Sequence, residues 1–264
     1  PAQSAASESQ PQQAAQRTAF RIASLKGPTT MGLVGLMDSV DKGEARHDYE
    51  VTMYGAADEI TPLLVKGEVD VALVPCNLAS VLYNKMKETG GVEVAAINTL
   101  GVLYIVTTGD DITSVADLAG KTIYSTGKGT TPEYTQMEGL SVALDMTEEW
   151  NKVSPDSALV TGVVLARTQF VEENEAAFAE FLEDYAASVE FVNANTQEAA
   201  ALVAQYGIVP KAEVAEKALP ACNITFITGA DMKAKVSGYL NVLYEQNAQA
   251  VGGQMPGDDF YYGA

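Results

Sequence analysis

Histidine and cysteine are scarce in this sequence of 264 residues. His47 is the only histidine, and its EARHDY surroundings are polar, so we expect a surface histidine rather than the base of a catalytic triad. Cys76 and Cys222 are too few for a disulfide scaffold and do not form a Cys/His cluster at metal-ligand spacing. They either form one bridge in an oxidising compartment or are two small buried thiols, which we favour. We expect no catalytic residues, no metal site and no cofactor.

Positive charge is scarce as well: 16 lysines and arginines stand against 35 aspartates and glutamates, a formal net charge of -19. Such a chain repels nucleic acids and anionic membrane surfaces, so we expect neither as a partner. No apolar run approaches the roughly 20 residues needed to cross a bilayer. With 47% hydrophobic residues, the chain is long enough to bury a substantial core in one or two domains.

Branched and aromatic residues are almost absent from the first segment, PAQSAASESQPQQAAQ. A segment of this composition cannot bury enough surface to order itself, so we predict a disordered leader or tether over residues 1–17. It has neither the basic start nor the apolar run of a signal peptide. A mature exported chain after signal removal has this appearance, and so has a trimmed chain.

The first third of the chain repeats a strand, a polar turn and a helix. Strands are expected over residues 19–25, 48–54 and 69–74, and helices over 31–40, 59–66 and from 77 onward. The VDVALV run is almost continuously apolar, which is typical of a strand covered on both faces. This rhythm predicts an α/β fold with a parallel sheet and crossover helices. Because ligands bind beyond the carboxyl ends of such strands, three turns are expected to converge on one rim.

The rest of the chain predicts more strands and then helices. Strands are expected over residues 92–97, 103–107, 122–124, 140–144 and 159–165, a short helix over 112–118, and helices from 172 to a last one over 230–247. The segment KTIYSTGKGTTPE (121–133) reads as a strand, a glycine-rich turn and a helix start, which suits a carboxylate, sulfonate or phosphate. Its spacing fits neither a Walker A loop nor the dinucleotide fingerprint, and a plain strand-to-helix turn is the alternative.

Two other features have simple structural explanations. Glu148 and Glu149 are adjacent on an expected helix and do not face each other, so we expect a solvated helix start rather than paired catalytic carboxylates. Trp150 is more readily a core or lobe-packing residue than a ligand-stacking one.

Four parts of the sequence resemble a known family. The segments LKGPTTMGL, GEVDVALVPCNLASVLYNK and TSVADLAGKTIYSTGKGTTPEY, with the closing helices, are similar to extracytoplasmic solute-binding proteins of ABC importers. The resemblance is to the type II group with sulfonate, nitrate and NMT1/THI5-like receptors. It implies a two-lobe periplasmic-binding-protein architecture, with lobe one over 18–103 plus 166–264 and lobe two over 104–165. Residues 103–107 and 159–165 match the two strands that cross between the lobes.

The resemblance also implies ligand-contacting turns, and the turn predictions add neighbouring rim residues. Lys26 and Lys128 are candidate contacts for an anion, each in a turn that follows a strand. The full set of candidate ligand-binding residues is Lys26, Gly27, Thr29, Thr30, Tyr54, Ala56, Pro75, Asn77, Thr99, Ser125, Thr126, Lys128, Thr130 and Thr131.

The function implied is non-enzymatic: capture of a small anionic or aromatic/heterocyclic solute between two lobes, and its delivery to an ABC permease in the membrane. The family also implies export, often as a lipoprotein, and a monomer is the default for a receptor that hinges. Two alternatives remain open at this point. One is an enzyme on the same fold, of THI5-type pyrimidine synthesis or menaquinone biosynthesis, and the other is a sensor or adhesion module of a longer chain.

One departure from the family concerns lobe two. Relatives continue the helix near Pro132 and add further strand–helix units, whereas only YTQMEG follows here, so roughly 60 residues are missing. Either the deletion is real, or the numbering runs through a stretch that is not shown. We therefore predict a reduced second lobe.

Overall fold

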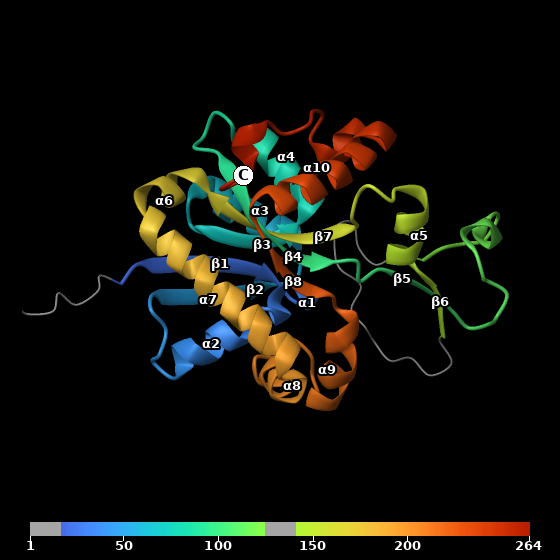
Figure 1. Cartoon of the computed structure of the whole chain (residues 1–264), viewed down its shortest axis with the longest axis horizontal. Coiled ribbons are helices and arrows are strands. Elements are labelled where there is room, and N and C mark those ends of the chain that lie inside the picture. The colour runs from blue at the N-terminus through green and yellow to red at the C-terminus, as the bar shows by residue number, and fades with distance from the viewer. Residues whose placement is uncertain (1–16, 125–140) are drawn as a thin grey trace, which may run out of the picture.

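The structure is a computed structural model that describes residues 17–124 and 141–264 (Figure 1). Its main element is a six-stranded sheet of order β2-β1-β3-β7-β4-β8. The strands are β1 (Ala19–Leu25), β2 (Asp48–Tyr54), β3 (Val71–Pro75), β4 (Val92–Leu100), β7 (Val160–Arg167) and β8 (Ile224–Ile227). β1 pairs in parallel with β2 and β3, whereas β7 is antiparallel to β3 and β4, and β8 is antiparallel to β4. The predicted α/β class is confirmed, with two antiparallel strands added to the parallel set.

Helices cover both faces of this sheet. One face carries α1 (Pro28–Met31), α2 (Val34–Asp41), α6 (Thr168–Glu173), α7 (Glu175–Ala194), α8 (Thr196–Gln205) and α9 (Ala212–Ala218). The other face carries α3 (Ala57–Lys66), α4 (Cys76–Met86) and α10 (Gly229–Gln246). Residues alternate between the two cores along each strand, as pleating requires: Phe20 and Ile22 enter the first core, Ala23 and Leu25 the second.

A stack of aromatic rings forms the centre of the first core. Phe20 and Phe181 stack at 5.3 Å between ring centroids, and Phe181 stacks on Tyr185 at 6.1 Å. All three side chains are fully buried. Since Phe181 and Tyr185 are four residues apart on α7, this stack fixes the long helix across the sheet.

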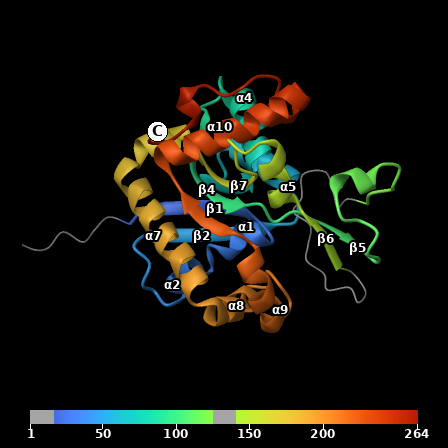
Figure 2. The same cartoon turned by 45° about the vertical axis from the view of Figure 1, so that its right-hand side comes forward.

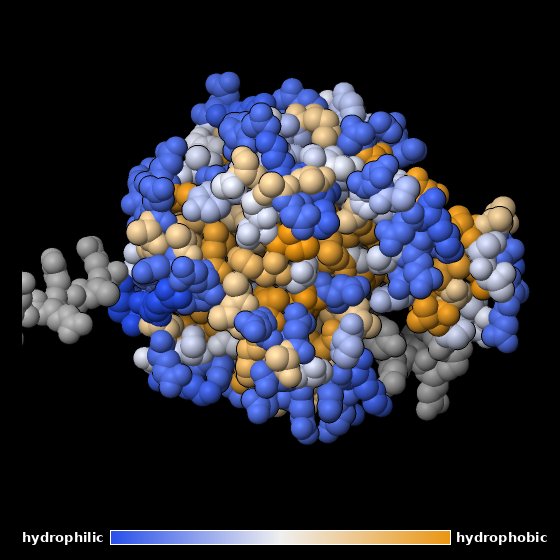
Figure 3. Space-filling view, viewed as in Figure 1, coloured by the Kyte–Doolittle hydropathy of each residue, from blue (hydrophilic) through white to orange (hydrophobic). Residues whose placement is uncertain are grey.

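A smaller unit extends from one end of the large sheet (Figure 2). It contains β5 (Tyr104–Thr107) and β6 (Ser141–Asp145), which pair antiparallel, with a 3₁₀ turn, η1 (Val115–Leu118), and helix α5 (Met146–Val153). Val106 and Val142 are opposite each other in the pairing and are both about half exposed, at 49% and 51%. Hydrophobic atoms are visible on this end of the molecule in Figure 3.

Several expectations differ from the structure in this second region. Residues 122–124 do not form the expected strand, and Tyr124 is 93% exposed. The helix expected over 112–118 is only the η1 turn. Residues 103–107 do not cross between sheets, because β5 lies wholly in the small sheet, and residues 160–165, assigned to lobe two, pair with β3 and β4 in the large one. The division into two lobes otherwise stays a prediction.

The prediction of buried thiols for the two cysteines is confirmed, and the prediction of a surface position for the histidine is wrong. Cys76 and Cys222 are free, buried thiols, and they belong to the two different cores. His47 is not a surface residue: only 4% of it is exposed, and its ring packs against Phe20 and Tyr49. Its immediate sequence neighbours are polar, but Tyr49, two residues on, and Phe20 on β1 cover the ring.

Candidate functional site

The strand directions gather many chain turns at one edge of the large sheet, which we call the rim. β1, β2, β3 and β4 end at the rim, and β7 and β8 begin there. The small unit is joined at the same edge, because the chain leaves β4 for β5 and returns from α5 to β7. Figure 2 shows β5, β6 and α5 beyond this end of the sheet. The rim therefore faces a second unit across two connections, the arrangement expected of a two-lobe receptor.

Hydrogen bonds of two buried hydroxyl groups stabilise the turn after β1. The Thr30 hydroxyl donates to the Leu25 carbonyl at 2.6 Å and lies 2.7 Å from the Ser24 hydroxyl. Thr29 and Thr30 are buried, whereas the Lys26 side chain is exposed. Gly27 has φ of 130°, which favours glycine. Of the residues predicted here, Thr30 fixes the turn through its hydroxyl and Thr29 accepts a hydrogen bond through its carbonyl, while the exposed Lys26 side chain has no partner among the described residues.

Asn98 and Gly162 belong to this region but were absent from the predicted set. The Asn98 amide donates to the Thr29 carbonyl at 3.4 Å and accepts from the Thr99 hydroxyl at 3.1 Å, which places buried Thr99 in the same network. A Cβ added to Gly162 would collide with the Asn98 side chain. The available signal was the glycine inside the apolar LVTGVVL run, because a glycine within a strand marks a close approach.

In the turn after β2, a side chain of the following helix already accepts a backbone N–H at the helix start. The Glu59 carboxylate accepts the Ala56 backbone N–H at 2.9 Å, and Asp58 adds a second acidic group to the first turn of α3. Tyr54 is partly buried against the second core, and its carbonyl accepts the Lys26 N–H at 2.9 Å. This helix start disfavours an anion because two carboxylates occupy it.

The helix start after β3 differs from the one after β2 in its capping and in its charge. α4 begins after Pro75 with neither a side-chain cap nor an acidic residue in its first turn. Among the described residues, its first N–H groups therefore have no side-chain acceptor, which suits an anionic or polar group. The Asn77 amide lies 3.5 Å from the Ala250 carbonyl, a long contact that leaves most of its hydrogen-bonding capacity unused. Ser125, Thr126, Lys128, Thr130 and Thr131 lie outside the described residues.

The connection from β4 to β5 has an unusual backbone. Gly101 and Val102 are consecutive residues in the left-handed region, with φ of 70° and 63°. Gly101 donates its N–H to the Leu159 carbonyl of the returning connection at 2.8 Å. A Cβ on Gly101 would collide with the Thr147 hydroxyl at the start of α5. The two connections are thus tied together at a site that only glycine fits.

Trp150 packs between the two units. Its ring centroid lies 5.3 Å from that of Tyr239 on α10, and its indole N–H donates to the Ser157 hydroxyl at 2.8 Å. Ser157 also lies against Gly238, where a Cβ would be 3.1 Å from the serine Cβ. The second connection therefore lies directly on α10, as a lobe-packing tryptophan requires.

The described residues contain no group of three or more His, Cys, Asp or Glu side chains that could hold a metal ion. Burial raises the pKa of the Cys76 thiol, so it is protonated and a poor nucleophile. Burial also raises the pKa of Cys222 to about 11. His47 lies at the start of β2, at the edge opposite the rim. The described residues at the rim offer hydrogen bonding and charge to a ligand.

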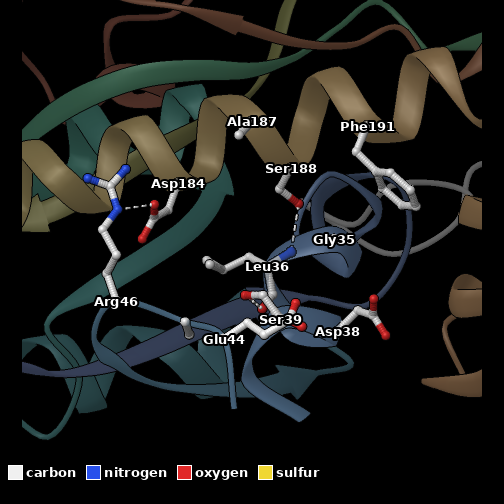
Figure 4. Close-up of a pocket in the computed structure, with 11 residues that line it drawn as sticks. Gly35, Leu36, Asp38, Ser39, Glu44, Arg46, Asp184, Ala187, Ser188 and Phe191 are labelled. Atoms are coloured by element: carbon white, nitrogen blue, oxygen red, sulfur yellow. Dashed lines mark hydrogen bonds and ion pairs between the residues drawn. The ribbon is translucent and has the colours of Figure 1, made fainter. Parts of the chain in front are cut away.

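A separate hollow of about 350 Å³ lies between α2 and α7 (Figure 4). Leu36, Ser188 and Phe191 line it, and the Ser188 hydroxyl accepts the Leu36 N–H at 2.9 Å. Arg46 and Asp184 at its side are paired at 2.7 Å. The Ser188 and Arg46 side chains that line it are therefore already engaged with protein partners.

In the part of the chain that the structure describes, no helix has the length and apolarity of a membrane span. No protein-family model matches the sequence, and no curated protein matches it.

Solved structures are similar in fold. An ABC transporter structure from Parabacteroides distasonis is 18% identical, with a TM-score of 0.70, over 92% of this chain and 98% of that one. The periplasmic aliphatic sulphonate binding protein SsuA from Escherichia coli is 13% identical, with a TM-score of 0.63, over 89% and 94%. A Candida albicans protein described as having the generic periplasmic binding protein fold is 15% identical, with a TM-score of 0.56, over 92% and 93%. The chain thus has the periplasmic-binding-protein fold that the sequence resemblance predicts.

Proposed function

We propose that this protein is the substrate-binding component of an ABC importer and captures a small solute between its two units. The observation that carries the proposal is the rim, where six strand ends face the small unit across two connections. A ligand bound there contacts both units, so its binding energy can favour a closed arrangement. The E. coli structure, named as a sulphonate-binding protein, and the P. distasonis structure, named as an ABC transporter, support the same function.

The contrast between two helix starts favours an anionic group on the ligand. α4 presents uncapped N–H groups without nearby acid in its first turn, whereas α3 is occupied by Asp58 and Glu59. Lys26 is exposed at the same rim. We therefore place the anionic group of the solute near Asn77 rather than near Ala56, with an aromatic or heterocyclic body as one form of the ligand.

The remaining properties follow from this role. The partner is a membrane permease, and the protein acts outside the cytoplasm as a monomer. The composition of residues 1–16 suits a tether to a lipid anchor, since Arg17 is already paired with Asp48. The second unit is reduced relative to the family, and an intact mass near 27.9 kDa is expected if the deletion is real.

A thermal-shift screen of alkanesulfonates, nitrate, pyrimidines and aromatic acids, followed by calorimetry, tests the proposal. Binding to the folded state raises the melting temperature. Asn77→Asp introduces a negative charge at the start of α4 and is expected to weaken binding of an anion at least tenfold, while the helix dipole tolerates the change. Asn195→Asp, at the start of α8, is the matched control and is expected to bind normally. A bound anion that is insensitive to Asn77→Asp would contradict the placement.

A further inference from the structure

The only histidine is held between the backbone of one strand and a carboxylate of another element. The Thr18 backbone N–H lies 3.2 Å from Nδ1 of His47, directly before β1. Nε2 lies 2.8 Å from a carboxylate oxygen of Glu180 on α7. The ring is buried, whereas the Glu180 side chain is 47% exposed.

These two contacts fix the protonation pattern of the ring. A backbone N–H can only donate, so Nδ1 accepts with its lone pair and carries no proton. Nε2 then carries the proton and donates it to Glu180. Addition of a second proton places an N–H on Nδ1, which points at another donor, so the Thr18 N–H loses its acceptor.

The residues around the ring hold the same part of the chain. Arg17 donates to the carbonyls of Ala45 and His47 at 3.0 and 2.9 Å and pairs with Asp48 at 2.8 Å. The Asp48 N–H donates to the Thr18 carbonyl at 3.0 Å. Residues 17 and 18 thus form the first attachment to the sheet among the described residues, and the His47 ring is one of its acceptors.

The charges that face His47 come from three elements. On α7, the Glu180 carboxylate contacts the ring, and Asp184 accepts the Tyr49 hydroxyl at 2.7 Å. Two guanidinium groups lie nearby in the sequence, one before β1 and one before β2, and each is already paired with carboxylates. These are Arg17, with Asp48, and Arg46, with Glu183 and Asp184. Of these charges, the Glu180 carboxylate is the one that contacts the ring, whereas a proton on Nδ1 would face the Thr18 N–H.

We propose that His47 is an acid-sensitive clasp: the neutral ring holds the Arg17–Thr18 segment on the sheet edge, and protonation releases that segment. The clasp lies at the edge opposite the rim, so release loosens the Arg17–Thr18 segment and leaves the strand ends at the rim in place. An extracytoplasmic chain would meet such acidification, but the clasp itself depends only on the contacts around His47.

Amide hydrogen exchange followed by NMR between pH 8 and pH 5 tests the proposal on the full chain. The protection factor of the Thr18 amide, corrected for intrinsic exchange, is expected to fall roughly fivefold to tenfold as the His47 ring resonances report protonation, the effect of about one hydrogen bond. Protection of Ile22, in the middle of β1, is expected to stay constant.

The matched variant is His47→Asn, which keeps an acceptor oxygen near the position of Nδ1 and does not titrate. Its Thr18 protection is expected to be independent of pH over the same range, with a circular dichroism melt as the check on folding. Constant Thr18 protection in the wild-type chain while the ring becomes protonated would overturn the proposal. So would a ring that stays neutral down to pH 5, or a His47→Asn variant with the same pH-dependent loss.

Discussion

The large sheet and the small unit differ in how they are stabilised. The large sheet is buried on both faces by two continuous cores, and nearly all of the large buried side chains belong to them. Among the described residues of the small unit, Leu144 and Ile112 are buried, and neither belongs to either core. A two-stranded sheet alone is marginally stable in water. The comparison indicates that the large sheet is stable independently of the small unit, whereas the small unit depends on its contacts with the large sheet.

The largest expected effect concerns the centre of the first core. Phe181→Ala removes a fully buried ring that stacks on Phe20 and Tyr185, and we expect a loss of about 3–5 kcal/mol in the free energy of unfolding. The half-exposed Val142→Ala, on the small sheet, is expected to cost less than about 0.5 kcal/mol. Urea denaturation of both variants measures the contrast. Equal costs would show that the small sheet is as tightly packed as the large one.

Ion pairs give the second contrast. The Asp70 carboxylate is buried and accepts the Arg21 backbone N–H at 3.1 Å and its guanidinium at 2.5 Å, with Arg167 at 3.4 Å. Asp70→Asn leaves these guanidinium groups without their charge partner, and we expect a loss of about 2 kcal/mol, reduced from the fully buried case because Arg21 is half exposed. Asp111→Asn breaks the exposed pair with Lys121 in the small unit and is expected to leave the unfolding midpoint unchanged.

Trp150 tests the dependence of the small unit on the large one. Trp150→Ala removes the contact with Tyr239, and we expect α5 to lose about 1 kcal/mol of local stability. Hydrogen exchange is expected to speed up about fivefold in α5 and β6, with no change in β1 or β3. Trp150→Phe keeps an aromatic ring and serves as the control. Uniform acceleration throughout the chain would contradict independent stability of the large sheet.

The smallest effect is a pH dependence within the large sheet. Burial, and secondarily the charge of Glu172, raises the pKa of Glu93 to about 7. The folded state then binds more protons than the unfolded state between about pH 4.5 and 7, so stability falls as pH rises through this window. Glu93→Gln is expected to remove this slope and to stabilise the protein at pH 8 by less than about 1 kcal/mol, because the group is partly solvated. Denaturation at pH 4.5 and pH 8 measures it.

The sequence predicts the large sheet better than the small unit. More of the large sheet is buried, and burial produces the apolar patterns that can be recognised in a sequence. β1 and β2 have their predicted bounds because alternation and flanking turns are local signals, and the final long helix follows from its apolar spacing. The insertion of β7 between β3 and β4 depends on pairing between residues far apart, which local patterns do not encode. Residues 122–124 have the composition of a strand, but a strand also needs a partner, and the described residues provide none for them.

The candidate ligand-binding residues stay a prediction, but the geometry behind them could be worked out from the sequence. The convergence of turns at one rim follows from strand direction, and Lys26, Tyr54, Pro75 and Asn77 lie there. The roles of Asn98 and His47 escaped prediction because their environments are built from distant elements. Nothing near His47 in the sequence indicates Glu180, 133 residues away, as its partner.

The most direct test of the central proposal uses Trp150, the only tryptophan, as a reporter at the contact between the two units. Its fluorescence is followed while a compound that binds in calorimetry is titrated into the wild-type chain and into Asn77→Asp. We expect a saturable change in the wild type, with one ligand per chain, and weaker binding by the variant. A compound that binds one to one while the fluorescence of Trp150 and the affinity of Asn77→Asp stay unchanged would contradict capture between the two units.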